Sequence, residues 1–273
     1  NGDVLSYSTF DNYVFENAVT GSLIFNYRKE KQGIKPIHFA FDSNYNISIV
    51  PEEDTSIFDK ITNCTKALKE VAELFKGMVV KDRQTVVFDT CDNNPDVFLL
   101  GKSIAKWIIK TPFFTDYNSL TIIGGTKKKA KHDVAPRIVI RRTGDTLCCS
   151  LLEKAALTES TLYSCWSKDN LIDNKYLIAV LNSTLLDFYN KKKNITNQQG
   201  FPQILMTELQ GLPIKVVSKS QQQPIITLVD RILEAKKLDP QSDTSVLEAE
   251  IDRLVYDLYG LTEDEIRIVE GNN

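Results

Sequence analysis

Short apolar runs separated by polar residues fill the first fifty positions of the chain. Their length is typical of β-strands, and strands are expected at residues 13–15, 22–27, 37–41 and 47–50. From residue 57 to residue 75 the apolar side chains follow helical spacing, and Gly77 supplies a C-terminal stop. Further strands are expected at residues 78–81, 84–88 and 161–167, and a helix at residues 175–189.

The last fifty residues predict a pair of amphipathic helices. Pro224 falls in a first helical turn and precedes an apolar stripe. Ser245 and Glu248 form a capping box for a second helix, which Gly260 ends, and Thr262 begins a short final helix in the same way. We expect the two longer helices to pack as an antiparallel pair on the body or on a partner.

The segment PRIVIRRTGDTLCCSLL, residues 136–152, joins two apolar runs through a Thr-Gly-Asp turn. It predicts a β-hairpin, because Gly144 can adopt the positive φ that a tight turn often needs. Alternation along the first strand places Arg137 and Arg141 on one face and Arg142 on the other. At least one arginine therefore faces the core, and a buried charge needs a partner.

Two kinds of partner suit an arginine of this hairpin. A carboxylate such as Asp145 would hold it within the protein, whereas a phosphate or a guanine edge would make it a nucleic-acid contact. The sequence leaves both open. We expect a carboxylate to hold at least one of Arg141 and Arg142.

Charge is distributed unevenly along the chain. Of 273 residues, 42% are hydrophobic and 25% charged, as in ordinary globular proteins, and the formal net charge is −3. Residues 76–142 nevertheless hold 13 Lys and Arg against 6 Asp and Glu, whereas residues 1–75 hold 7 against 11 and residues 216–273 hold 6 against 12. A basic middle between acidic ends indicates a polyanionic ligand, with a merely solvated basic surface as the alternative.

Membrane and secretory signals are missing from the sequence. No apolar run approaches the roughly 18 residues of a membrane span, and no signal peptide is recognisable. The five cysteines lack CxxC pairing, which favours reduced thiols. We expect a cytoplasmic protein without a membrane partner.

No catalytic or metal-binding constellation is predicted. The two histidines, His38 and His132, lie far apart without acidic neighbours at ligand spacing. Neither a GxGxxG nor a Walker loop occurs. Asn94-Pro95-Asp96 is better explained as a turn.

Several segments in order carry a family resemblance: DNYVFENAVTGSLIFNY (11–27), FKGMVVKDRQTVVFD (75–89), FLLGKSIAKW (98–107), PRIVIRRTGD (136–145), TLYSCW (161–166), KYLIAVLNSTLLDFYNK (175–191), FPQILMTELQGLPI (201–214) and both helical stretches of the tail. Together they resemble the C-terminal part of adenine-specific DNA methyltransferases of restriction–modification systems, with its TaqI-like C-terminal specificity domain. The chain departs from the whole enzyme in lacking the upstream glycine-rich cofactor loop and the Asn-Pro-Pro-aromatic loop.

This resemblance implies a mixed α/β (α+β) fold, with a β-rich target-recognition body, packed helices and a C-terminal helical pair. The implied divisions are closing strands of a methyltransferase domain (1–55), a connecting helix (56–77), the TaqI-like DNA target-recognition domain (78–218) and a helical segment (219–273). It further implies a fragment that recognises double-stranded DNA. An upstream domain would bind S-adenosylmethionine and methylate the flipped adenine, so no cofactor is expected in this chain.

Catalysis by this chain alone is not expected, whereas its parent is expected to be a site-specific, adenine-specific DNA methyltransferase. The sequence leaves open whether a restriction endonuclease is attached. One alternative is a non-enzymatic specificity subunit that docks a separate methyltransferase. Another is a protein-interaction scaffold without DNA function.

Candidate DNA contacts follow from side-chain chemistry. Lysines suit sequence-independent phosphate contacts, whereas arginine reads guanine and glutamine reads adenine. The candidates are Lys127, Lys128, Lys129, Lys131, Arg137, Arg141, Arg142, Lys191, Lys192, Lys193, Gln198, Gln199 and Gln203. The alternatives are that the lysine runs are solvated loops and that the glutamines belong to a linker.

Overall fold

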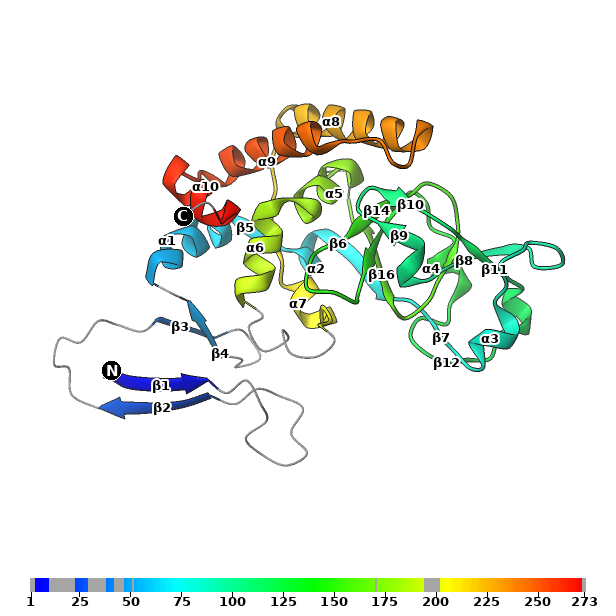
Figure 1. Cartoon of the computed structure of the whole chain (residues 1–273), viewed down its shortest axis with the longest axis horizontal. Helices are drawn as coiled ribbons and strands as arrows, with labels where there is room; N and C mark the ends of the chain where they lie inside the picture. Colours follow the sequence, from blue (N-terminus) through cyan, green and yellow to red (C-terminus); the bar gives the residue numbers. More distant parts are fainter. Residues whose placement is uncertain are drawn as a thin grey trace.

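The computed structural model describes residues 3–9, 23–28, 38–41, 47–50, 52–169, 171–193 and 202–271, with side chains from residue 56 onward (Figure 1). Within these residues the fold is mixed α/β, with several small sheets and helices packed around them, as the sequence predicted. No described helix is long and apolar enough to cross a membrane.

The N-terminal part consists of two separate antiparallel strand pairs and one helix. Strand β1 (Asp3–Thr9) pairs with β2 (Leu23–Arg28), and β3 (His38–Phe41) pairs with β4 (Ile47–Val50). Helix α1 (Glu52–Thr62) follows. The expected strands at 22–27, 37–41 and 47–50 are thus confirmed, and the one at 13–15 lies outside the described residues.

A four-stranded antiparallel sheet forms the centre of the body. Its order is β14 (Cys149–Leu152), β13 (Arg137–Arg141), β16 (Leu162–Ser167) and β6 (Ala72–Lys76). The predicted hairpin and the predicted strand at 161–167 are therefore confirmed. Side chains alternate along β13, so that Ile138 and Ile140 join the main core while Val139 joins a second core on the opposite face.

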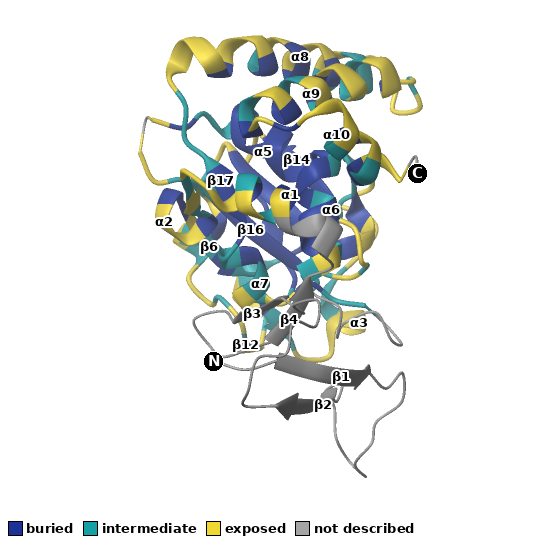
Figure 2. Cartoon of the chain, turned by 90° about the vertical axis from the view of Figure 1, so that its left-hand side faces the viewer, coloured by how far each residue is buried: buried dark blue, intermediate teal, exposed yellow. Residues whose placement is uncertain are grey.

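Helices cover the main-core face of this sheet. Helix α5 (Asn174–Asn182) contacts three of its strands and is followed by α6 (Thr184–Lys193). The helical hairpin of α8 (Lys219–Leu238) and α9 (Ser245–Tyr259) lies over α5, and α10 (Glu263–Glu270) ends the described chain (Figure 1). Figure 2 shows that the buried residues of α8 and α9 face the body while their outer surfaces are exposed. The predicted helical pair is confirmed.

Smaller elements build a lobe against the other face of the sheet. They are β7 (Val79–Val80), α3 (Arg83–Val86), β8 (Asp96–Leu99), η1 (Gly101–Ser103), β9 (Ile104–Ala105), β10 (Ile108–Ile109), β11 (Phe113–Thr115), η2 (Tyr117–Ser119), β12 (Ile122–Gly124), α4 (Lys129–His132) and β15 (Leu157–Thr158). Strands β11, β8 and β15 form one sheet, in which β15 runs parallel to β8. The pairs β7–β12 and β9–β10 complete the lobe.

The helix expected over residues 57–75 is wrong beyond Thr62. The chain turns at Cys64, whose φ is +53°, and forms β5 (Thr65–Ala67), the four-residue helix α2 (Leu68–Val71) and β6. Strand β5 pairs with β17 (Pro213–Lys215), which follows the short helix α7 (Met206–Gln210). Pairing with distant strands overrides the local helical spacing, so the predicted connecting helix of 56–77 is in fact helix, strand, helix and strand.

Two other local predictions need correction. Residues 84–88 were expected as a strand, but α3 occupies most of this segment. The helix expected over residues 175–189 is divided at Ser183 into α5 and α6. At the tail, α8 begins at Lys219 and is capped by Ser218, so Pro224 lies inside the helix, and Thr244 rather than Ser245 is the N-cap of α9.

Candidate nucleic-acid interface

The end of the β13–β14 hairpin is extended by a distant segment. The amide of Gly144 donates to the carbonyl oxygen of Pro202 at 2.8 Å, and the amide of Ile204 donates to that of Arg142 at 2.9 Å. Residues 202–204 therefore run alongside the turn, and Gln203 stands next to it. Gly144 has φ +112°, the positive φ that the sequence predicted for this turn and that glycine adopts without steric cost.

Arg141 and Arg142 emerge from this end half-buried. The Nε atoms of both are buried without a hydrogen-bond partner, and neither arginine forms an ion pair with any described residue. Asp145 instead accepts from the Thr146 hydroxyl. The expected carboxylate brace is therefore not found in the described part of the chain. Arg142 lies beside the hydroxyl of Tyr163 instead. The pKa of Tyr163 is raised by burial, and the guanidinium of Arg142 partly opposes this shift.

Arg137 belongs to the core. It is 0% exposed, and its guanidinium donates to the carbonyl oxygens of His132 at 2.6 Å, Val134 at 2.7 Å and Ala156 at 2.5 Å. Burial lowers its pKa from 12.5 to about 10. The candidate role of Arg137 as a DNA contact is therefore withdrawn, because no part of its side chain reaches the surface; its partners are backbone carbonyls rather than the carboxylate considered from the sequence.

The lysine-rich turn after β12 requires glycine. Gly125 has φ +70°, and a Cβ atom there would lie 2.1 Å from the carbonyl oxygen of Gly77. A side chain at this position would thus collide with backbone as well as strain the turn. The close approach fixes the start of the segment that carries Lys127, Lys128, Lys129 and Lys131, which we call the lysine turn.

His132 anchors the other end of the lysine turn. Its Nδ1 accepts a hydrogen bond from the Thr158 amide at 3.1 Å, so its Nε2 carries the proton and donates to the carbonyl oxygen of Thr126 at 3.0 Å. The ring is 0% exposed, and burial is the main cause that lowers its pKa from 6.5 to about 4. His132 is thus a neutral structural residue, and the sequence carried no signal for this role.

The members of the lysine turn differ in availability. Lys129 forms ion pairs with Asp96 at 3.0 Å and Asp133 at 3.3 Å, and its hydrogen bond to Asp96 is the main cause that raises its pKa. Lys127 and Lys128 are exposed, Lys131 is half-buried, and none of them is paired with a described carboxylate. Three of the four lysines thus have no ion-pair partner in the described part of the chain and can bind an external anion.

The lysines of α6 are engaged with their own helix. Lys191 pairs with Asp187 at 2.9 Å, and the other carboxylate oxygen of Asp187 accepts from the amide of Leu147. Lys192 lies over the ring of Phe188 at 5.5 Å and Lys193 over that of Tyr189 at 5.4 Å. Asp187 thus joins α6 to the hairpin end. The sequence shows only its i,i+4 spacing from Lys191, not its bond to Leu147.

The candidates thus gather at opposite ends of one strand. Arg141, Arg142, Gln203 and Lys191 surround the hairpin end of β13, and the lysine turn adjoins its other end through His132 and Arg137. A strand of five residues spans about 13 Å. Gln198 and Gln199 lie outside the described residues.

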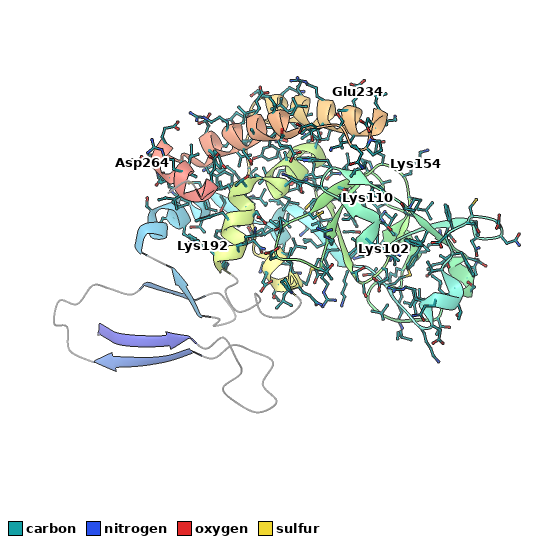
Figure 3. All side chains as sticks on the ribbon, in the orientation of Figure 1. Lys102, Lys110, Lys154, Lys192, Glu234 and Asp264 are labelled. Carbon is teal, nitrogen blue, oxygen red and sulfur yellow. The ribbon has the colours of Figure 1, made fainter. Side chains whose placement is uncertain are left out.

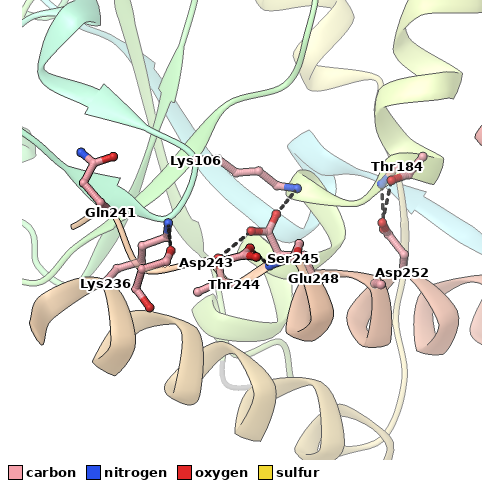
Figure 4. A pocket seen from close by; sticks show the side chains of 11 residues that line it. Lys106, Thr184, Lys236, Gln241, Asp243, Thr244, Ser245, Glu248 and Asp252 are labelled. Atoms are coloured by element: carbon pink, nitrogen blue, oxygen red, sulfur yellow. Dashed lines mark hydrogen bonds and ion pairs between the residues drawn. The ribbon is translucent and has the colours of Figure 1, made fainter. Parts of the chain in front are cut away.

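A polar cavity of about 560 Å³ opens between the β9–β10 hairpin and the α8–α9 loop (Figure 4). The polar groups at its floor bind one another: Lys106 pairs with Glu248 at 2.7 Å, and Asp252 accepts from the amide and hydroxyl of Thr184 at 2.8 and 2.6 Å. These contacts hold the helical hairpin against the body, so the cavity is part of the packing between the two. Among the described residues no cluster of three or more metal-ligating side chains occurs.

One family model matches the part of the chain that carries this arrangement. Residues 96–214, which include β13, β14 and the lysine turn, match the model of the TaqI-like C-terminal specificity domain. Residues 96–214 of this chain are therefore similar to that specificity domain. No curated protein matches the sequence.

Several solved structures are similar to this chain at low identity, and one of them shares its fold. The type IIL restriction-modification enzyme MmeI, in complex with DNA, aligns with 98% of this chain and 45% of its own at a TM-score of 0.57 and 10% identity. The HsdS subunit from Thermoanaerobacter tengcongensis aligns with 76% of this chain and 51% of its own at 0.45 and 12%, and the type IIG restriction endonuclease BpuSI with 77% and 33% at 0.45 and 13%. The chain spans about half or less of the length of these proteins.

Proposed function

We propose that the chain is the DNA target-recognition part of an adenine-specific methyltransferase of a restriction–modification system, acting in the cytoplasm. It positions double-stranded DNA for an upstream domain that binds S-adenosylmethionine and methylates the target adenine. The observation that carries the proposal is the family match over residues 96–214, whose hairpin end brings Arg141, Arg142 and Gln203 together. Two cations beside an amide are a combination suited to guanine and adenine edges.

The roles divide according to the partners of each side chain. Arg142 has a buried, unpartnered Nε and no carboxylate among the described residues, so its guanidinium can form bidentate bonds to a guanine edge without breaking an ion pair. Gln203 is held beside it by backbone pairing and reads an adjacent adenine. Lys127 and Lys128, exposed and unpaired, contact phosphates.

The test is a selection of binding sites from random duplexes, repeated with three variants. Arg142→Ala is expected to weaken binding by about 1–3 kcal/mol and to relax the preference at one base pair. Lys128→Ala is expected to weaken all duplexes equally and to lower the salt slope by about 0.9. Arg231→Ala, on the exposed face of α8, is the charge-matched control and should change neither the base preference nor the salt slope.

Two results would contradict the proposal. Failure of the chain to bind any duplex at low salt would refute a DNA function. Equal loss across all sequences for Arg142→Ala and Lys128→Ala would refute the division between base reading and phosphate contact.

A further inference from the structure

Three lysines outside the candidate residues share the lobe that carries the β9–β10 hairpin. Lys102, Lys110 and Lys154, which we call the second lysine group, are exposed, and none forms an ion pair with a described residue. Between residues 97 and 115 the chain carries lysines but no acidic residue. Figure 3 shows the three side chains on the part of the body to the right of Lys192.

The backbone holds these lysines in a fixed arrangement. The amide of Trp107 donates to the carbonyl oxygen of Cys149 at 3.0 Å, and the hydroxyl of Ser150 donates to that of Ile108 at 2.9 Å. Strands β10 and β14 therefore lie side by side and run in the same direction. Lys110, just after β10, lies close to the end of β14, and Lys154 comes two residues after that end. Lys102 is restrained on the same lobe by the ring of Phe113, at 4.5 Å from its centroid.

Part of the second lysine group lies near the lysine turn. The guanidinium of Arg137 binds the carbonyls of both His132 and Ala156, the near neighbours in sequence of Lys131 and Lys154. Lys154 and the lysine turn thus lie toward the same end of β13, opposite the hairpin arginines. Lys102 follows Gly101, whose amide donates to the Thr161 hydroxyl at 2.9 Å, close to the arginine end.

Three acidic residues close to these lysines in sequence or space are already paired. Asp96 and Asp133 bind Lys129, and Glu248 binds Lys106. Glu153 is the exposed acid next to Lys154. Among the described residues, the second lysine group therefore keeps its charges free of ion pairs.

We propose that the second lysine group contacts the phosphate backbone of the duplex whose bases the hairpin arginines read. The inference rests on the proposed function and extends it to a second surface. The length of β13, about 13 Å, is close to the width of the major groove, about 12 Å. With Arg141 and Arg142 in the groove, Lys110 and Lys154 at the far end of β13 face the sugar-phosphate strand that borders it, and Lys102 faces the same strand nearer the arginines.

The test compares two triple variants of the full chain that carry the same change in charge. One replaces the second lysine group (Lys102→Gln, Lys110→Gln, Lys154→Gln). The control replaces three exposed lysines of β5, α2 and α8 (Lys66→Gln, Lys69→Gln, Lys219→Gln). Binding to a mixed-sequence duplex is measured across about 50 to 200 mM salt, where each phosphate contact contributes about 0.9 to the slope of log K against log salt.

The second-group variant should lower the slope by about 2 to 3 while the control leaves it nearly unchanged. Thermal unfolding of both variants should match that of the starting chain, because all six lysines are exposed. Equal slopes for the two variants would overturn the assignment yet leave the proposed function standing. Absence of duplex binding by the starting chain would overturn both. If polyglutamate competes as well as duplex DNA for the second lysine group, its ligand is an acidic protein and the assignment to DNA is overturned.

Discussion

Replacing Arg137 with methionine tests the assignment of this arginine to the core. The change leaves three buried carbonyl oxygens, those of His132, Val134 and Ala156, without their donors. At about 2 kcal/mol for each orphaned acceptor, the loss is about 6 kcal/mol. Burial lowers the pKa of Arg137 from 12.5 to about 10, so removal of the buried charge returns about 3 kcal/mol. The expected net destabilisation is about 3 kcal/mol.

The assay is urea unfolding followed by circular dichroism, with the slope m checked in each variant. Arg231→Met is the control, since Arg231 is exposed on α8, and it should change stability by less than about 0.5 kcal/mol. The reasoning is refuted if Arg137→Met unfolds within about 1 kcal/mol of the starting chain. A variant that stays equally stable but loses DNA binding would return Arg137 to the DNA contacts.

Three further predictions concern the supports of the interface. The pKa of His132 is about 4 in the folded chain and 6.5 in the unfolded one. The stability that the neutral ring contributes is therefore complete above pH 6.5 and is lost as the pH falls towards 4. The chain should lose about 3 kcal/mol more over this range than His132→Gln, measured by urea unfolding, and equal pH profiles would contradict this. Gly125→Ala should cost more than about 2 kcal/mol and weaken duplex binding, whereas Gly211→Ala, at an ordinary φ, should be nearly neutral. Asp252→Ala removes the acceptor at the start of α6 and should lower the free energy of unfolding by about 1–2 kcal/mol; a cost no greater than that of the exposed Asp257→Ala would contradict this.

Elements whose stability is local were predictable. The β13–β14 hairpin follows from side-chain alternation around a glycine turn, and the α8–α9 pair follows from apolar stripes and caps. The capping box of Thr262 and the left-handed Gly260 occur where the sequence placed them. In each case the determining residues lie within a few positions of one another.

Elements that depend on distant partners were not predictable. The apolar spacing of residues 57–75 suits a helix, yet β5 pairs with β17 and β6 completes the central sheet beside β16. Cross-strand pairing and burial outweigh helix propensity there, and neither can be read from the segment itself.

The candidate site divides in the same way. The sequence by itself determined which cations the chain carries, that three arginines sit on one hairpin and that lysines follow a Gly-Gly turn, because composition and alternation are local properties. Only the tertiary structure decided that Arg137 faces carbonyls in the core, that Lys129 is neutralised by Asp96 and that Gln203 lies beside Arg142. The physical reason is that a charged side chain contacts an external ligand or an internal partner according to what the folded chain places around it, and those neighbours come from residues far away in sequence.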